Sequence, residues 1–388
     1  MINNSKKIAL TGGAAAAEAL RQINPDVMPV YPITPQTPII ETFAKMVADG
    51  EADTEMIEAE SEHSAMSAAV GASAAGVRAM TASSSQGIML MAEILPIASG
   101  MRLPILMLVS ARAISAPINI HGDHQDVMFV RDAGWIQIFS ENAQEVYDNT
   151  LIALKLAEKK RIPAMVIMDG FQTSHSVENL EILENSAAKN FVGEYKAKNH
   201  LLDFEDPKTF GPVSLPNSFF EFKRAQAESM DGAIGEIGEI FGEYGKISGR
   251  EYDLFEAYRL DDAEKAIVVA GSTAGTAKVA VDELREQGEK AGLLKIKLFR
   301  PFPYDQVAEV LKNVGKIAVF DRTVSFGANA PLCGEIIQTI STIPNKKFTI
   351  QSCIYGLGGR EIFKEDIKKV FEGLSGDKIE GIKYIGLK

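Results

Sequence analysis

Three carboxylates within five residues, Glu58, Glu60 and Glu62, precede a run of small side chains. Residues 65–76 read AMSAAVGASAAG, and a helix of such residues lets other groups come close to its backbone. At the start of this helix, Glu62 would have its ionisation tuned by burial and by the helix N-terminus. A tuned carboxylate suits acid–base chemistry. The alternative is a solvated helix start that is capped by Ser61.

A second kind of chemistry, the binding of a small anion, is indicated by Thr34 and Arg112. Thr34 lies in the stretch 28–38, MPVYPITPQTP, whose four prolines fix the loop after a predicted strand at 27–31. Ligands of α/β proteins bind at such strand ends. Arg112 follows the apolar predicted strand 103–110, where a cation needs an acidic partner or an anion. The alternatives are a solvated Thr34 and a structural salt bridge at Arg112.

The stretch 120–126, IHGDHQD, offers four side chains that can bind metals: His121, Asp123, His124 and Asp126. Their spacing matches no common zinc signature, so we expect no metal site and favour a polar loop at the rim of a site or at a subunit contact. The two cysteines, Cys333 and Cys353, form no CxxC pattern. They cannot hold an iron–sulfur or zinc site by themselves, and we expect two buried, reduced thiols.

The composition is that of an acidic globular protein. Of 388 residues, 46% are hydrophobic and 24% are charged, and the formal net charge is -12. This charge argues against nucleic acids and anionic membranes as partners. The sequence shows no signal-peptide pattern, and its apolar runs are far shorter than the ~20 residues that span a bilayer. We therefore expect a soluble, cytoplasmic protein.

Alternating strands and helices must position these residues. Apolar strand patterns recur at 6–11, 27–31, 55–57, 79–82, 103–110, 136–139 and 163–168, with helical patterns between them. Such alternation predicts an α/β protein with doubly wound sheets. The Gly12-Gly13 turn belongs to no phosphate-binding motif, because it contains neither GxGxxG nor GxxxxGK(S/T), and is interpreted as a packing turn.

The alternation stops near residue 178 and resumes near residue 259, which predicts two domains. The first covers 1–258 and ends in a long arm from about 178 that lies over the domain surface. The second covers 259–388 and is a smaller α/β domain. Single helices are expected over 88–98 and 225–247.

Several motifs resemble a known family. YPITPQTPIIE (31–41), ESEHSAMSAAVGASAAG (60–76), SSQG (84–87), ARA (111–113), GDHQD (122–126) and DGFQTSH (169–175) are similar to the first domain of pyruvate:ferredoxin oxidoreductases. FRPFP (299–303) and AVFDRT (318–323) resemble the second domain of that family, which is similar to the transketolase C-terminal domain. The likeness covers nearly the whole chain in the same order. A chain of this length resembles the alpha subunit of the multi-subunit forms.

The resemblance implies a fold and a set of site residues. The first domain would be a thiamine-diphosphate-binding domain of the pyrimidine type, and the second a transketolase-C-terminal-like domain. Glu62 would hydrogen-bond N1′ of the thiamine aminopyrimidine, and Pro32 and Ile33 would also bind the cofactor. Thr34 and Arg112 would hold the carboxylate of a 2-oxoacid.

The resemblance also implies a reaction and partners. The enzyme would oxidatively decarboxylate pyruvate with coenzyme A to acetyl-CoA and CO2, and would pass the electrons to ferredoxin. Mg²⁺ and the [4Fe–4S] clusters would lie on partner chains, the beta, gamma and ferredoxin-like delta subunits. The alternatives are the same reaction on branched-chain or other 2-oxoacids, or a non-catalytic assembly subunit, against which the intact Glu62, Thr34 and Arg112 argue.

Overall fold

The computed structural model describes residues 5–344, 346–374 and 381–388. Its first sheet has the strand order β12-β6-β7-β5-β4. A parallel bridge from Val27 to Ala79 extends it to the parallel pair β2-β3. Only β12 runs antiparallel to its neighbour. The strands are β2 (Val27–Val30), β3 (Glu55–Glu58), β4 (Met80–Ser83), β5 (Leu106–Ala111), β6 (Ile136–Phe139), β7 (Ala164–Asp169) and β12 (Leu298–Arg300).

Helices cover both faces of this sheet. The central strand β5 is apolar at almost every position because its side chains are buried on both faces. Leu106 and Leu108 point into one core, whereas Met107 and Val109 point into another. Such double burial removes the usual alternation of polar and apolar residues. One face carries α1 (Gly12–Ile23), α2 (Thr37–Ala48), α7 (Ala143–Lys160) and α10 (Ala233–Ser248); the other carries α3 (Glu62–Ala75), α4 (Ser85–Met91) and α5 (Leu95–Gly100).

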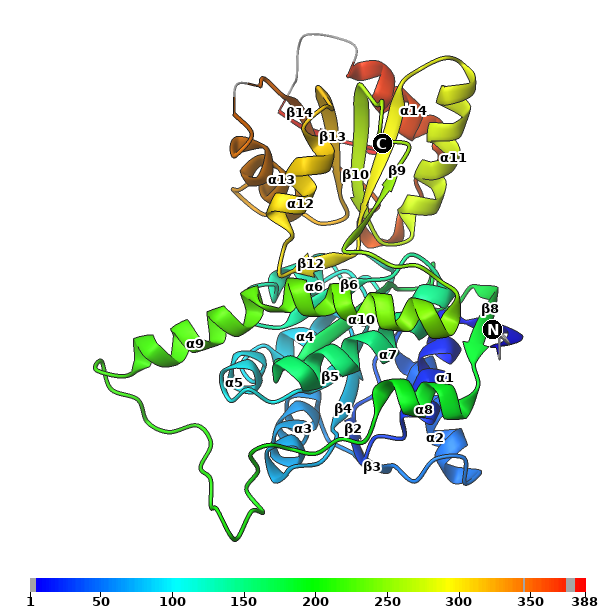
Figure 1. Cartoon of the computed structure of the whole chain (residues 1–388). Helices are drawn as coiled ribbons and strands as arrows, with labels where there is room; N and C mark the ends of the chain where they lie inside the picture. Colours follow the sequence, from blue (N-terminus) through cyan, green and yellow to red (C-terminus); the bar gives the residue numbers. More distant parts are fainter. Residues whose placement is uncertain (1–4, 345, 375–380) are drawn as a thin grey trace.

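The second sheet has the order β15-β14-β13-β10-β11-β9 and is parallel except for β9. Helices cover both of its faces, so the expected α/β class with two doubly wound sheets is confirmed (Figure 1). Its elements are β9 (Phe255–Tyr258), β10 (Lys265–Ala270), α11 (Thr273–Glu286), β11 (Ala291–Ile296), α12 (Tyr304–Leu311), β13 (Lys316–Asp321), α13 (Pro331–Ser341), β14 (Thr349–Ile354), η1 (Leu357–Gly359), α14 (Lys364–Gly373) and β15 (Ile382–Tyr384).

The helix predicted over 88–98 is in fact two helices, α4 and α5. Pro96 stands in the first turn of α5, a place that proline tolerates because the first helical amides have no acceptor. The helix predicted over 225–247 is likewise divided at Gly232, into α9 (Phe219–Asp231) and α10.

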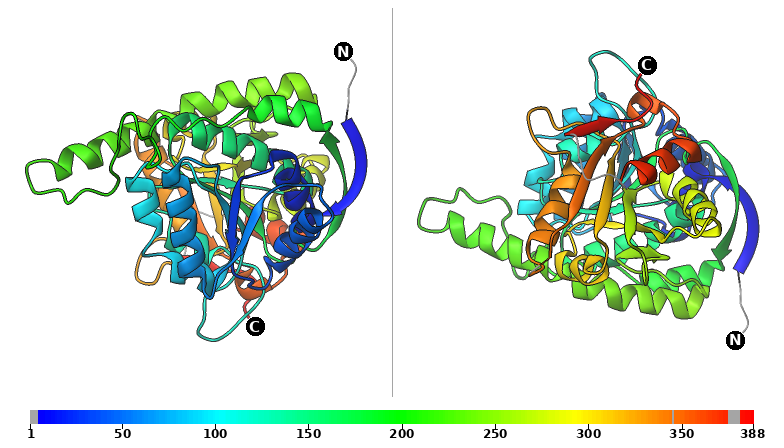
Figure 2. Two further views of the ribbon diagram at one scale, coloured as in Figure 1. Left: turned by 90° about the horizontal axis from the view of Figure 1, so that it is seen from below. Right: turned by 90° about the horizontal axis from the view of Figure 1, so that it is seen from above.

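The segment from residue 177 begins with regular structure. Strand β8 (Val177–Leu183) pairs antiparallel with β1 (Ser5–Thr11), and α8 (Asn185–Val192) follows it. Residues 193–218 contain no helix or strand. Part of this segment lies against the first domain, because the amide of Leu201 donates to the carbonyl of Ala74 at 2.8 Å and Phe210 packs against the core, whereas the start of α9 extends outward (Figures 1 and 2). The arm over the domain surface stays a prediction.

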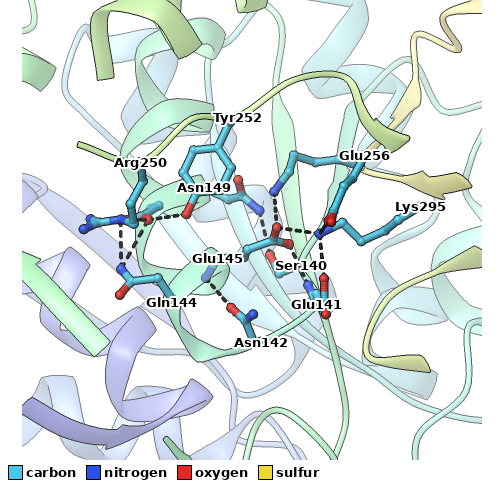
Figure 3. Close-up of polar contacts among 12 residues, drawn as sticks. Ser140, Glu141, Asn142, Gln144, Glu145, Asn149, Arg250, Tyr252, Glu256 and Lys295 are labelled. Atoms are coloured by element: carbon cyan, nitrogen blue, oxygen red, sulfur yellow. Dashed lines mark hydrogen bonds and ion pairs between the residues drawn. The ribbon is translucent and has the colours of Figure 1, made fainter. Parts of the chain in front are cut away.

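The two sheets are joined by a buried cluster of charges (Figure 3). Lys295 donates to Glu141 at 2.6 Å and to Glu145 at 2.9 Å, and Lys297 lies 2.8 Å from Glu145. Burial acts to raise the pKa of Glu145, but the ammonium groups of Lys297 and Lys295 outweigh it and lower the pKa to about 2. Because Glu145 begins α7 and Lys295 ends β11, these pairs hold the second domain against the first.

Candidate functional site

The loops after β2, β4 and β5 meet at one edge of the first sheet. The Gln36 side chain donates to the carbonyl of Ala82 at 2.9 Å, and the Ser84 hydroxyl donates to the carbonyl of Ser110 at 2.6 Å. Each bond ties one loop to the strand beside it. The carboxyl ends of parallel strands are where α/β proteins bind ligands, so this edge is the candidate active site.

Glu62 is the first residue of α3 and is 6% exposed. Ser61 caps the helix, as its position indicates, by accepting a hydrogen bond from the backbone amide of Ser64. Within the described part of the chain, no hydrogen bond or ion pair reaches the Glu62 carboxylate. A methyl group at Gly87 would lie 2.7 Å from Glu62 Oε1 and 2.4 Å from Ser83 Oγ. Glycine is therefore required at position 87, and it lets the first turn of α4 approach the carboxylate.

Arg112 is also 6% exposed, and its guanidinium is bound by carbonyl groups only. Nε donates to the carbonyl of Asn119 at 2.9 Å, and Nη1 donates to the carbonyl of Thr34 at 2.8 Å. Burial lowers the pKa of the guanidinium from its ordinary value. No carboxylate pairs with the guanidinium among the described residues, so the structural salt bridge considered above is absent there. A buried cation without an anion favours an anionic ligand.

Thr34 and Arg112 are thus brought together, as the sequence predicts. The Thr34 side chain is exposed, and no described residue forms a hydrogen bond with its hydroxyl. Pro32 and Ile33 lie in the same loop, where the carbonyl of Ile33 accepts a hydrogen bond from the amide of Gln36 at 2.9 Å. The hydroxyl of Thr34 and the guanidinium of Arg112 are therefore both available to bind a ligand beside this loop.

Asp126 connects the start of α4, at Ser85, to Arg112, a role that the sequence reasoning missed. Its Oδ2 accepts from the amides of Ser85 at 2.8 Å and Arg112 at 2.9 Å, and Oδ1 accepts from the amide of Val127 at 2.7 Å. Burial raises the pKa of Asp126 to about 7.

The other polar residues of 120–126 face the second domain. His124 Nε2 lies 2.5 Å from Asp169 Oδ1, and Arg322 Nη1 lies 3.1 Å from Asp169 Oδ2. Burial acts to raise the pKa of Asp169, but His124 and Arg322 outweigh it, so the pKa is lowered. The amide of Gly358 donates to Asp123 at 3.0 Å. The loop was expected at the rim of a site or at a subunit contact. At Asp123 and His124 it forms a buried contact that involves both domains, in which Asp123 and Asp169 each have protein donors.

The remaining chemical features of the sequence have structural roles. A methyl group at Gly12 would lie 2.5 Å from the carbonyl oxygen of Thr173, so the Gly12-Gly13 turn is a packing turn. Cys333 and Cys353 are buried free thiols. Across the described ranges, no cluster of three or more His, Cys, Asp or Glu side chains could hold a metal ion, and no helix is long and apolar enough to cross a membrane.

Comparison with known protein families identifies the family of this chain. Residues 18–241 match the thiamine-diphosphate-binding domain of pyruvate flavodoxin/ferredoxin oxidoreductases, and residues 263–367 match core domain II of pyruvate:ferredoxin oxidoreductase. The chain belongs to the pyruvate flavodoxin/ferredoxin oxidoreductase family, as a subunit of such an enzyme. The resemblance inferred from the motifs is confirmed.

Two relatives and one solved structure illustrate the likeness. The chain is 51% identical to "Pyruvate synthase subunit PorA" of Thermotoga maritima, over 99% of this chain and 98% of that protein. It is 40% identical to "Ketoisovalerate oxidoreductase subunit VorA" of Pyrococcus abyssi, over 95% and 93%. A chain of the 2-oxoglutarate:ferredoxin oxidoreductase from Magnetococcus marinus has the same fold, with a TM-score of 0.75 at 20% identity; the match covers 96% of the present chain but 65% of that one.

Proposed function

We propose that this chain is the alpha subunit of a pyruvate synthase, and that it binds the aminopyrimidine half of thiamine diphosphate and the carboxylate of pyruvate. The observation that carries the proposal is Glu62, a buried carboxylate to which no described residue donates. Buried polar groups in native proteins nearly always have a partner. A ligand that donates to Glu62 at the Gly87 edge would supply it.

The residues present fit this cofactor. Ser83 Oγ and Ser110 Oγ are buried at the ends of β4 and β5, and no described residue forms a hydrogen bond with them. When bound, thiamine diphosphate supplies the carbon nucleophile that reacts with a 2-oxoacid. Glu62 would share a proton with N1′ of the aminopyrimidine, which is acid–base assistance by a positioned carboxylate. Gly87 would leave room for the ring, and Pro32 and Ile33 would border it.

Arg112 and Thr34 would hold the substrate carboxylate. A guanidinium fork matches a carboxylate, and Nη2 has no partner in the described part of the chain. The carbonyls of Asn119 and Thr34 hold the guanidinium in place without neutralising its charge. An incoming carboxylate would therefore meet an oriented, uncompensated cation and the free hydroxyl of Thr34.

Pyruvate is favoured over a branched-chain 2-oxoacid because the higher identity is to the pyruvate synthase subunit, 51% against 40%. The test is to assemble the chain with its partner subunits and to compare kcat/KM for pyruvate and 2-oxoisovalerate, with coenzyme A and ferredoxin as co-substrates. A preference for pyruvate of at least about tenfold is expected, the range in which pocket size discriminates aliphatic groups. Equal or reversed preference would contradict the substrate assignment.

We further propose that the cofactor diphosphate, Mg²⁺ and the [4Fe–4S] clusters are bound by partner chains. The sequence offers no phosphate-cradling motif and no four-cysteine set. The isolated chain with thiamine diphosphate, Mg²⁺, pyruvate, coenzyme A and a viologen dye should give no sustained dye reduction. Addition of the partner subunits should start it. Sustained reduction by the isolated chain would contradict a site divided between chains.

A further inference from the structure

The loop of residues 113–123 holds one side of the Arg112 guanidinium. The backbone carbonyl of Asn119 accepts a hydrogen bond from Arg112 Nε at 2.9 Å, one of the two hydrogen bonds that the guanidinium makes with described residues. The loop itself contains no helix or strand. Because no regular backbone ladder fixes such a loop, the place of the Asn119 carbonyl depends on what the loop contacts.

The side chain of Asn119 makes two hydrogen bonds that fix the loop. Its Oδ1 accepts from the amide of His121 at 2.7 Å, and its Nδ2 donates to the carbonyl of Gly358 at 3.1 Å. The first bond is local, a turn that asparagine commonly forms with the residue two positions further on. The second spans 239 residues of sequence and reaches the second domain. Asn119 therefore contacts Arg112 through its backbone and the second domain through its amide.

The second domain meets this loop with η1 and uses its glycines for the contact. The amide of Gly358 donates to Asp123 at 3.0 Å, and the amide of Gly359 donates to the carbonyl of Gly122 at 2.9 Å. Gly358 has a φ of +59°, and a methyl group there would lie 2.4 Å from Asn119 Nδ2. The contact thus needs glycine at position 358, both for the backbone conformation and for space.

We propose that Asn119 is a positioning residue for the substrate carboxylate, and that it acts on Arg112 through the contact between the loop 113–123 and η1. The inference rests on the proposed function, in which Arg112 binds that carboxylate. A guanidinium fork matches a carboxylate only in a defined orientation, which the carbonyls of Asn119 and Thr34 set. The second domain therefore contributes to substrate binding, although Thr34 and Arg112 both lie in the first.

The first test compares two substitutions of Asn119 in the enzyme assembled with its partner subunits. Asn119→Asp keeps the acceptor for the amide of His121 but loses the donor to Gly358, whereas Asn119→Ala loses both. Each should raise the KM for pyruvate about 2- to 10-fold, the range that one neutral hydrogen bond supports. The kcat should stay near the wild-type value, as should the affinity for thiamine diphosphate, because only the orientation of the carboxylate-binding group changes. In an Arg112→Ala background neither substitution should raise the KM further, since Asn119 acts through Arg112.

The second test approaches the loop from the second domain. Gly358→Ala should raise the KM in the same way. It should also speed hydrogen exchange at the backbone amides of residues 113–123, measured by mass spectrometry on the full-length chain without substrate or cofactor. The matched control is Gly327→Ala, another glycine of the second domain with a φ of +81°, at which a methyl group would meet nothing within 4 Å. It should leave both the KM and the exchange of residues 113–123 at their wild-type values.

The outcomes separate this inference from the proposed function. If Arg112→Ala leaves the KM unchanged, the proposed binding of the carboxylate fails, and the inference fails with it. If Arg112→Ala raises the KM but Asn119→Asp does not, only the positioning role is rejected. An effect of Asn119→Ala that persists in the Arg112→Ala background also overturns the inference, as does unchanged exchange in Gly358→Ala. A loss of cofactor affinity as large as the rise in KM would show a general disturbance of the site and would overturn it too.

Discussion

Glu62 and Arg112 are buried side chains with few partners: no described residue donates to the Glu62 carboxylate, and the Arg112 guanidinium donates only to the carbonyls of Asn119 and Thr34. Three other buried carboxylates have partners: Asp126, Asp169 and Glu145 each accept from or pair with two or more donors. Groups that stay unpaired in a native structure call for a ligand. At the scale of the residue, the candidate chemistry therefore rests on two missing partners: a donor to the Glu62 carboxylate and an anion beside the Arg112 guanidinium.

Glu62→Gln should leave the fold intact and slow turnover of the assembled enzyme by roughly 10²–10⁴-fold, the range of acid–base assistance. The amide keeps the shape of the side chain but cannot take up a proton. The decisive measurement is hydrogen exchange at C2 of bound thiamine diphosphate, with far-ultraviolet circular dichroism as a control of the fold. Exchange at the wild-type rate would remove Glu62 from its proposed role.

Arg112→Ala should raise the KM for pyruvate strongly, and Thr34→Ala should raise it several-fold. A hydrogen bond to a charged group contributes about 1.5–3 kcal/mol and a neutral one about half of that. Arg112→Lys should recover little, because lysine lacks the fork that holds the carbonyls of Thr34 and Asn119. Arg259→Ala, at an exposed arginine of the second domain, is the control and should change nothing. An unchanged KM in the first two variants would place the carboxylate elsewhere.

At the scale of the element, α3 and α4 pack together, and α4 comes close to Glu62 at Gly87. Gly71 and Gly87 make this testable, because both are helical glycines with different surroundings. A methyl group at Gly71 meets nothing within 4 Å, whereas one at Gly87 meets Ser83 and Glu62. Gly71 therefore only lowers the stability of its helix, whereas Gly87 is needed because a larger residue would clash with Ser83 and Glu62.

Gly87→Ala should weaken binding of thiamine diphosphate to the assembled enzyme by at least ~10-fold, since the methyl group must displace the Glu62 carboxylate, and a shift of about 1.4 kcal/mol suffices for that change. Gly71→Ala is the matched control and should raise thermal stability slightly, by up to ~1 kcal/mol, because alanine favours the helix. Cofactor affinity, measured by calorimetry, and the melting temperature separate the two effects. Equal cofactor affinity in both variants would contradict the assigned geometry.

At the scale of the whole molecule, the two domains are held by charges from segments far apart in the chain. Lys295 and Lys297 reach Glu141 and Glu145 across about 150 residues of sequence. His124 and Arg322 meet at Asp169 in the same junction. Asp126, which binds the amides of Ser85 and Arg112, lies two residues after His124, which belongs to this junction. We therefore expect the contact between the domains to stabilise the loops of the candidate site.

Glu145→Gln should change how stability depends on acid. The folded-state pKa of Glu145 is about 2, below the ordinary 4.5, so its contribution is present above pH 4.5 and is lost as the pH falls through about 2. The wild type should therefore lose more free energy of unfolding in this interval than the variant, on the order of 3 kcal/mol more, since one pKa unit corresponds to about 1.4 kcal/mol. Glu264→Gln, in an exposed pair with Lys290, should behave as the wild type. Equal acid dependence in wild type and Glu145→Gln would contradict the pairing.

The sequence by itself determined the elements and the kinds of chemistry. The apolar run before Arg112, the prolines around Thr34 and the small residues after Glu62 are local patterns, and local patterns decide where strands and helices form. The strand ends then follow, and with them the edge at which ligands bind. For this reason the predicted residues Thr34 and Arg112 lie together in the structure.

The tertiary structure decided what each of these residues touches. That Arg112 is held by carbonyls without a carboxylate, that Asp126 joins Ser85 to Arg112, and that Gly87 faces Glu62 depend on contacts between distant segments. The spacing of residue types along the chain predicts helices and strands, but it does not predict which groups form hydrogen bonds. The free energy of a buried polar group depends on the donors and acceptors that folding brings close to it.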